Sequence, residues 1–319
     1  MCTAISYKTS DHYFGRNLDL ERSYGECVAV TPRKFHLKMR KTESLISHYA
    51  MIGMATVADG FPLYFEATNE KGLSAAGLNF PDNADYKPYA EGKTNVTPFE
   101  FIPWILGKCA DTDEAMAAME NLNLVNISFS EGLPLSPLHW FVSDRKRSVV
   151  VESTAEGLKI YEDPIGVLTN NPTFDYHMMN LNNYMHLHEG AAENRLSPNH
   201  ELSNYSLGMG ALGLPGDFSS ASRFVKAAFV KLRSCSGESE SESVSQFFHI
   251  LASVAMPKGC VLAANGDYEY TRYSSCCNTD RGIYYYTTYN NPAHVRVCLF
   301  DFDLDCKEMY TCQWENCQQ

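Results

Sequence analysis

The first twenty residues, MCTAISYKTSDHYFGRNLDL (1–20), decide the fold of this chain. Apolar and polar residues alternate in residues 2–8 and again in residues 12–20, a pattern typical of half-buried strands. The polar residues from Thr9 to Asp11 separate the two runs and predict a turn. We therefore expect a hairpin whose first strand starts at residue 2, so that the N-terminus is held in a sheet.

In the rest of the chain, the predicted strands lie mainly toward both ends and the predicted helices mainly in the middle. Strands are predicted at 27–33, 48–57, 62–69 and 72–80, in a meander from 138 that ends at IGVLTNNP (165–172), and at 268–275, 282–289 and 294–302. Helices are predicted from Thr97 or Pro98 to 109, after the caps Asp111 and Thr112, over 174–187, and after Ser219 and Ser220. We interpret 189–218 as loop and 236–245 as a solvated linker into a last helix. This order indicates the α+β class, with sheets packed on each other and helices outside, in one domain of residues 1–319.

Composition and charge limit the partners of the protein. Its 319 residues are 45% hydrophobic and carry a formal net charge of −12, which repels phosphate backbones and anionic lipid surfaces. Nucleic acid is therefore not an expected partner. No run approaches the roughly 18 consecutive apolar residues of a membrane span, and the start lacks the basic and apolar regions of a secretory signal. We expect a cytoplasmic protein with no membrane partner.

Cysteines are numerous, and their spacing argues against a metal site. The eleven lie at 2, 27, 109, 235, 260, 276, 277, 298, 306, 312 and 317, with no C-x-x-C pair and no histidine at ligand spacing. Without an export signal, a disulfide framework is not expected either. His186 and His188 lack a third ligand nearby, so we interpret them as solvent-facing. We predict no metal and no cofactor.

Cys2 differs from the other cysteines by its position. Removal of Met1 before this small residue would make Cys2 the N-terminal residue. A thiol and an α-amine both titrate within reach of neutral pH, so the amine can accept the thiol proton and later protonate a leaving nitrogen. Taken alone, a cysteine at position 2 is more often an ordinary residue than a nucleophile.

Two charged residues lie one short strand away from Cys2. A guanidinium at Arg16 would favour the ionised thiol, and a carboxylate at Asp19 would orient the thiol or the ammonium by hydrogen bonding. An ordinary surface ion pair is the alternative. Positions 16 and 19 face opposite sides of a straight strand, so we expect a bend near Leu18 if both are to reach Cys2.

A set of motifs in fixed order resembles a known family over almost the whole chain. The choloylglycine hydrolases, especially the bile salt hydrolases, are similar to MCT (1–3), FGRNLD (14–19), NEKGLSAAGLNF (69–80), LHWFVSD (138–144), LTNNPTFDYH (168–177), GLPGDFSSASRF (213–224) and YYYTTY (284–289). The resemblance implies an N-terminal-nucleophile fold, which is a four-layer αββα sandwich with the active site at the end of the facing sheets. It also implies a homotetramer that hydrolyses the amide bond between a bile acid and glycine or taurine.

The resemblance also assigns roles to individual residues. It implies that Cys2 is nucleophile and base, that Arg16 and Asp19 tune and orient it, and that Arg223 completes the polar shell. It implies that Asn79 and Asn170 hold the oxyanion, a role that suits amide donors. Without the resemblance, each asparagine is interpreted as a turn former, as Asn171 still is, and Arg223 as a surface cation of a helix. The family positions that would contact substrate are Arg16, Asn79, Leu18, Phe65, Phe129 and Leu133, of which the last four would line an apolar pocket for the steroid.

Two alternatives remain open. A penicillin V acylase of the same family would use the same catalytic residues on a phenoxyacetyl amide. We favour bile salts because Asn79 and its GLNF context resemble the bile-salt branch. A non-catalytic protein that keeps the fold and binds bile salts is the second alternative.

Overall fold

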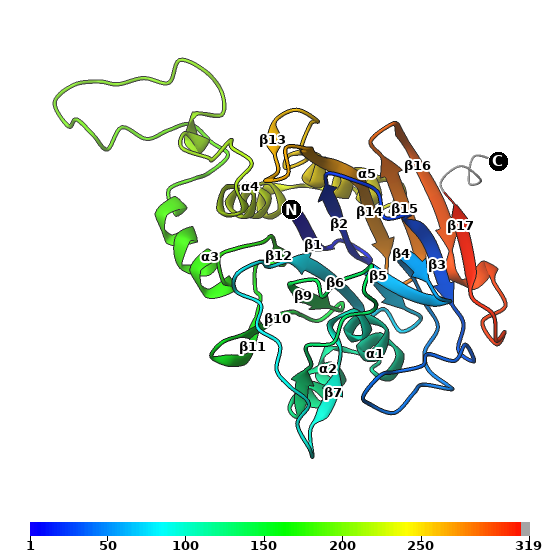
Figure 1. Cartoon of the computed structure of the whole chain (residues 1–319). Coiled ribbons are helices and arrows are strands. Elements are labelled where there is room, and N and C mark those ends of the chain that lie inside the picture. The colour runs from blue at the N-terminus through cyan, green and yellow to red at the C-terminus, as the bar shows by residue number, and fades with distance from the viewer. Residues whose placement is uncertain (314–319) are drawn as a thin grey trace.

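Two antiparallel sheets face each other in the computed structural model, which describes residues 1–313 (Figure 1). The first sheet has seven strands, and the N-terminal hairpin lies near its middle. Its order is β12 (Val167–Leu168), β1 (Cys2–Lys8), β2 (His12–Leu20), β14 (Tyr268–Asn278), β15 (Ile283–Thr288) and β16 (Asn291–Cys298), with β13 (Val261–Leu262) beside β14.

The second sheet has eight strands and pairs a strand from late in the chain with an early one. Its order is β11 (Gly157–Glu162), β10 (Ser148–Thr154), β9 (Leu138–Ser143), β6 (Ser74–Asn79), β5 (Phe61–Asn69), β4 (Met51–Ala58), β3 (Cys27–Thr31) and β17 (Tyr310–Gln313). A separate parallel pair joins β7 (Thr94–Val96) and β8 (Leu122–Leu124).

Helices cover the outer faces of both sheets. α4 (Ser220–Arg233) and α5 (Glu240–Ala252) pack on the first sheet, and α1 (Phe101–Lys108) packs on β5 and β6 of the second, with α2 (Thr112–Met119) against α1 (Figure 1). α3 (Phe174–Leu181) contacts α4. The short 3₁₀ helices are η1 (Pro98–Glu100), η2 (Asn182–Tyr184), η3 (Met209–Ala211) and η4 (Leu299–Asp301). The predicted four-layer αββα arrangement is therefore confirmed.

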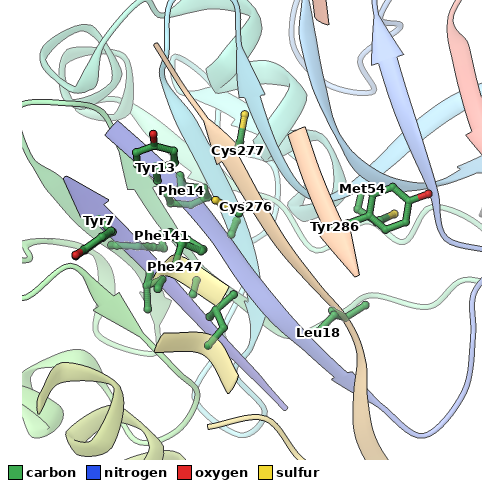
Figure 2. Packing of buried hydrophobic residues seen from close by; sticks show 14 of the residues in the cluster. Tyr7, Tyr13, Phe14, Leu18, Met54, Phe141, Phe247, Cys276, Cys277 and Tyr286 are labelled. Atoms are coloured by element: carbon green, nitrogen blue, oxygen red, sulfur yellow. The ribbon is translucent and has the colours of Figure 1, made fainter. Parts of the chain in front are cut away.

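Apolar side chains fill the layers between these elements. Phe14 of β2 stacks on Phe141 of β9 with ring centroids 5.4 Å apart, so this cluster joins the two sheets (Figure 2). On the other side of the second sheet, Trp140 of β9 packs on Phe101 of α1 with centroids 4.6 Å apart. Each buried side chain of this size stabilises the fold by roughly 1.5–3 kcal/mol.

The predicted N-terminal hairpin is confirmed. β1 and β2 pair in register from Cys2 opposite Leu18 to Lys8 opposite His12. Because residues directly opposite in a sheet share a face, the Cys2 and Leu18 side chains lie on the same side of it. The hairpin therefore fixes the position of Cys2 through the fold itself.

Two helix predictions need correction. The helix expected over 174–187 ends at Leu181 and continues only as η2, because side chains such as Asn182, whose Nδ2 donates to the Met179 carbonyl, compete with helical bonding. The solvated linker expected over 236–245 is wrong from residue 239 onward. Ser239 and Glu242 form a capping box there, and α5 starts at Glu240.

Residues 189–208, which we call the arm, extend away from the sandwich between α3 and α4 (Figure 1). Its apolar side chains are exposed, with Leu196 at 87%, Tyr205 at 82% and Leu207 at 101%. Within residues 1–313, no helix combines the length and the apolar character that crossing a membrane requires.

Candidate active site

Cys2 opens β1, and its backbone is held on both sides. Its amide N donates to Oδ1 of Asn170 at 2.8 Å, and its carbonyl oxygen accepts from Nη1 of Arg223 at 2.5 Å. The residue is only 3% exposed. The sequence-predicted residues Asn170 and Arg223 therefore meet at Cys2, although they lie far from it in the chain.

Arg223 reaches Cys2 from the first turns of α4. Ser219 caps this helix by accepting from the amide of Ser222, which orients the turn that carries Arg223. The guanidinium also donates to Oγ1 of Thr3 at 2.7 Å and to Oδ1 of Asn170 at 2.7 Å. Burial lowers the pKa of Arg223, but an arginine stays charged in a protein. Arg223 is therefore a buried cation of the site and not a cation on the helix surface.

Asn170 joins three parts of the site. Its Nδ2 donates to the carbonyl of Asn79 at 2.7 Å, and its backbone N donates to Oγ of Ser220 at 2.8 Å. Its own carbonyl bonds Nε2 of His177 at 2.8 Å, and burial lowers the pKa of that histidine to about 4. An amide group has two hydrogens, so one N–H of Asn170 remains for a ligand. Asn79 ends β6, and this residue is exposed.

Arg16 and Asp19 lie on opposite faces of the first sheet. Arg16 points to the second sheet, where its Nη1 donates to the carbonyls of Phe65 at 3.0 Å and Gly77 at 2.6 Å. Burial acts to lower the pKa of Arg16, but the negative groups around it, Cys2 first, raise it overall. Asp19 lies on the other face and accepts from Oγ1 of Thr271 at 2.6 Å.

The expected bend in the second strand is not what positions these two residues. β2 continues its pairing with β1 through Leu18, and the irregularity lies in the neighbouring strand, where Arg272 of β14 is the extra residue. A bulge of this kind increases local twist without breaking the partner strand. Arg16 thus shares the face of Cys2, while Asp19 approaches the N-terminus from the helix side.

Met1 occupies the place beside the candidate nucleophile. Its amine donates to the carbonyl of Asp19 at 2.8 Å and contacts the carboxylate of Glu269, and its carbonyl accepts from the amide of Asp19 at 3.0 Å. Burial lowers the pKa of this amine. Oδ2 of Asp19 is buried and has no hydrogen-bond partner among residues 1–313. Loss of Met1 would leave the polar groups of Asp19 facing the new amine.

The four apolar residues predicted to line a pocket do not all meet. Leu18 and Phe65 pack in the same cluster as Cys2. Phe129 packs on Phe61 and Phe99, with centroids 6.2 and 5.2 Å away, in the other cluster. Leu133 is half-buried and bridges to residue 130. The apolar pocket stays a prediction.

A family model described as linear amide C–N hydrolases, choloylglycine hydrolase family, matches residues 2–312. The chain belongs to the choloylglycine hydrolase family. It is therefore a linear amide C–N hydrolase, as the resemblance implied.

Relatives of this family cover almost the whole chain. The bile salt hydrolase/transferase of Lactiplantibacillus plantarum is 56% identical over 97% of this chain and 95% of its own length. The crystal structure of the C2A mutant of the conjugated bile acid hydrolase from Clostridium perfringens superposes with a TM-score of 0.91, at 38% identity, over 98% of this chain and 97% of its own. Penicillin V acylase from Agrobacterium tumefaciens shares the fold, with a TM-score of 0.78 at 19% identity over 99% of this chain and 93% of its own. The N-terminal-nucleophile hydrolase fold is thus confirmed.

Sequence reasoning missed the residues that support Asn170. His177 and Ser220 stand inside motifs that resemble the choloylglycine hydrolase family, but a motif does not say which backbone groups need a partner. The histidine four residues into α3 and the serine that starts α4 acquire their role only when both helices meet at Asn170. The sequence shows that these two residues are present, but it does not show that they contact Asn170.

Histidines and cysteines outside the Cys2 site were also considered as possible metal ligands. Within residues 1–313, no group of histidine, cysteine and acidic side chains has the arrangement of a metal site. Nδ1 of His188 accepts from the amide of Gly190 at 3.1 Å, and His186 is exposed. Cys317 lies outside the described residues.

Proposed function

We propose that this protein is a bile salt hydrolase that cleaves the amide bond between a bile acid and glycine or taurine through a thioester on Cys2. The observation that carries the proposal is the double anchoring of the Cys2 backbone by Asn170 and Arg223, which aims the thiol at the face shared with Arg16. The 56% identical relative, whose name is bile salt hydrolase/transferase, supports the choice of substrate.

In the first half of the reaction, Cys2 has lost Met1 and its free α-amine accepts the thiol proton. The sulfur attacks the carbonyl carbon of the substrate, and the carbonyl oxygen becomes an oxyanion that amide donors from Asn79 and Asn170 stabilise. The ammonium then protonates the leaving nitrogen as the C–N bond breaks. Glycine or taurine departs, and the bile acid remains as a thioester.

In the second half, water replaces the leaving amine. The α-amine of Cys2 takes a proton from water as its oxygen attacks the thioester carbonyl. The C–S bond breaks, the sulfur regains the proton, and the free bile acid leaves. Arg16 and Arg223 supply positive charge that favours the ionised sulfur in both halves, and Asp19 orients the ammonium.

The steroid requires an apolar surface next to the thiol. Leu18 and Phe65 already share the cluster of Cys2 and would meet the ring system first. Phe129 and Leu133 belong to the segment between β8 and β9, which would supply the outer wall. Arg16 and Asn79 would contact the polar end of the substrate.

Product analysis tests this function. The mature protein is incubated with glycocholate, taurocholate and penicillin V side by side, and Cys2→Ala serves as the control. We expect glycine or taurine release that is absent in Cys2→Ala. An overwhelming preference for phenoxyacetate release would make the protein a penicillin V acylase, and bile-salt binding without any product would make it a binding protein.

We further infer that the protein is a homotetramer of the cytoplasm. Support for an oligomer comes from the exposed apolar side chains of the arm, which a second copy of this chain would cover. Support for the cytoplasm comes from buried free thiols such as Cys27, Cys109 and Cys276, which suit a reducing compartment. The solution mass of the intact chain, compared with a variant that carries Leu196→Ser and Leu207→Ser, tests the oligomer, and cell fractionation tests the location.

A further inference from the structure

A carboxylate lies inside the apolar layer between the two sheets. Glu66 belongs to β5 and is 1% exposed, and its carboxylate contacts side chains of the opposite sheet. Oε2 accepts from the phenol of Tyr273 at 2.6 Å and Oε1 accepts from the phenol of Tyr284 at 2.5 Å. Placing a charge in such a layer costs free energy unless it is paired and hydrogen-bonded. Because packing alone does not require a carboxylate at this position, we consider a functional role for Glu66.

The charged partner of Glu66 is Arg16, which shares the face of Cys2. Nε of Arg16 lies 3.9 Å from Oε2 of Glu66, and both side chains are almost completely buried. Burial raises the pKa of Glu66, while Arg16 and the two phenols act against that rise. Both carboxylate oxygens accept a phenol hydrogen, and the Arg16 guanidinium lies next to one of them. The hydrogen-bond pattern therefore fits an ionised Glu66.

Backbone geometry explains why Arg16 can settle here. β5 and β6 pair only from Glu66 opposite Ala76 to Thr68 opposite Ser74, and the two strands separate beyond Glu66. Phe65 is also the extra residue where the pairing of β4 with β5 shifts. The carbonyls of Phe65 and Gly77 lie where β5 and β6 no longer pair with each other, and Nη1 of Arg16 donates to both. Nη2 is buried without a hydrogen-bond partner among residues 1–313.

The charges around Cys2 come from several elements. Cys2 and its N-terminus interact with Arg16 and Asp19 of β2, Arg223 of α4 and Glu269 of β14. Behind Arg16 lie Glu66 of β5, Tyr273 of β14 and Tyr284 of β15. The charged side chains among them that are almost fully buried are two arginines and two carboxylates, so their charges balance. Removing the Glu66 charge would leave the arginines in excess beside the thiol.

We propose that Glu66 is a positioning residue of the active site, held between two phenols so that it fixes the Arg16 guanidinium behind Cys2 and sets the net charge there. Glu66 touches neither substrate nor thiol and acts through Arg16. The inference rests on the proposed function in one respect, because it takes Cys2 as the nucleophile.

Alkylation of Cys2 by iodoacetamide tests the charge without any substrate. The rate is followed over pH on the mature protein, by the mass of the N-terminal peptide, for wild type and Glu66→Gln. Loss of a nearby negative charge favours the ionised sulfur, so the pH of half-maximal rate should fall by about one unit. Glycocholate turnover of Glu66→Gln should fall on the order of tenfold in kcat with little change in KM, because Arg16 is less well placed.

Two further variants separate charge from packing. Tyr284→Phe keeps the charge of Glu66 and loses one hydrogen bond, so kcat should fall while the alkylation curve keeps its midpoint. Glu100→Gln removes another buried carboxylate, which accepts from the backbone amides of Arg40 and Thr97, and should leave the curve unchanged.

The outcomes distinguish this inference from the proposed function. Wild type that alkylates at Cys2 but releases no glycine or taurine would overturn the function alone. An active wild type whose alkylation curve coincides with that of Glu66→Gln would overturn the role of Glu66. If Glu66→Gln does not fold, Tyr284→Phe decides, and an unchanged kcat there would count against the inference.

Discussion

Replacing Asn170 by alanine tests how the site holds Cys2. Oδ1 of Asn170 accepts from Cys2 N and from Arg223 Nη2, and Nδ2 donates to the Asn79 carbonyl, all in buried or partly buried positions. Alanine leaves three groups without this partner, and each such group costs about 1–3 kcal/mol when it stays unpaired. Water entering the vacated space offsets part of the sum, so we expect the free energy of unfolding to fall by about 3–5 kcal/mol.

The same substitution should affect catalysis separately from stability. It removes an amide donor to the oxyanion, and loss of one such donor lowers kcat by about 10²–10³. Urea unfolding followed by circular dichroism measures the stability. Glycine release from glycocholate, measured at a temperature where the variant is folded, gives kcat and KM.

Asn171→Ala is the matched control next to it in sequence. Nδ2 of Asn171 donates only to the carbonyl of Pro81, at 2.5 Å, among the described residues. We expect a loss of about 1 kcal/mol and an unchanged kcat. Wild-type kcat and stability in Asn170→Ala would refute the reasoning, and so would an equal loss in Asn171→Ala.

Three other predictions concern the nucleophile, its processing and the pH dependence of stability. Cys2→Ala should abolish turnover while the unfolding midpoint stays close to that of wild type, and residual hydrolysis would exclude Cys2 as nucleophile. Protein made with an inhibitor of methionine aminopeptidase should retain Met1 and be inactive, which intact mass and turnover of the same sample check. Burial lowers the pKa of His12 to about 4, so the unfolded chain takes up this proton first and stability falls as the pH drops from about 6.5 toward 4. His12→Gln should reduce the loss of unfolding free energy between pH 7 and pH 5 by about 2 kcal/mol, whereas the exposed His36→Gln should not.

The elements that sequence predicted well are those whose signals are local. The alternation in residues 2–20 specifies the hairpin, and the caps Thr97, Asp111 and Ser219 mark where helical segments begin. Each depends on neighbours within a few residues, so a single sequence contains the whole signal. β17 (Tyr310–Gln313) was missed because it is a short edge strand whose partner, β3, lies almost the length of the chain away.

Site residues were named more easily than their contacts. Family resemblance pointed to Arg16 and Asp19, but only the register of β1 and β2 tells which of them shares the face of Cys2. Glu66 gave no signal at all, since a glutamate in an alternating strand is ordinarily a solvent-facing residue. Its burial follows from the meeting of β5 with β14 and β15, which no local pattern encodes.

Met1 links the assembly of the site to its activation. In the unprocessed chain, the α-amine of Met1 donates to the carbonyl of Asp19 and the carbonyl of Met1 accepts from the amide of Asp19, as one more residue of the hairpin. Removing Met1 therefore does more than free an amine, because it also unpairs the Asp19 backbone close to Oδ2 of Asp19, which has no hydrogen-bond partner among residues 1–313. The new ammonium would find an acceptor from Asp19 on one side and Oδ1 of Asn170 on the other. Two acceptors set the orientation of the amine, so the same processing step that creates the base also fixes where it points.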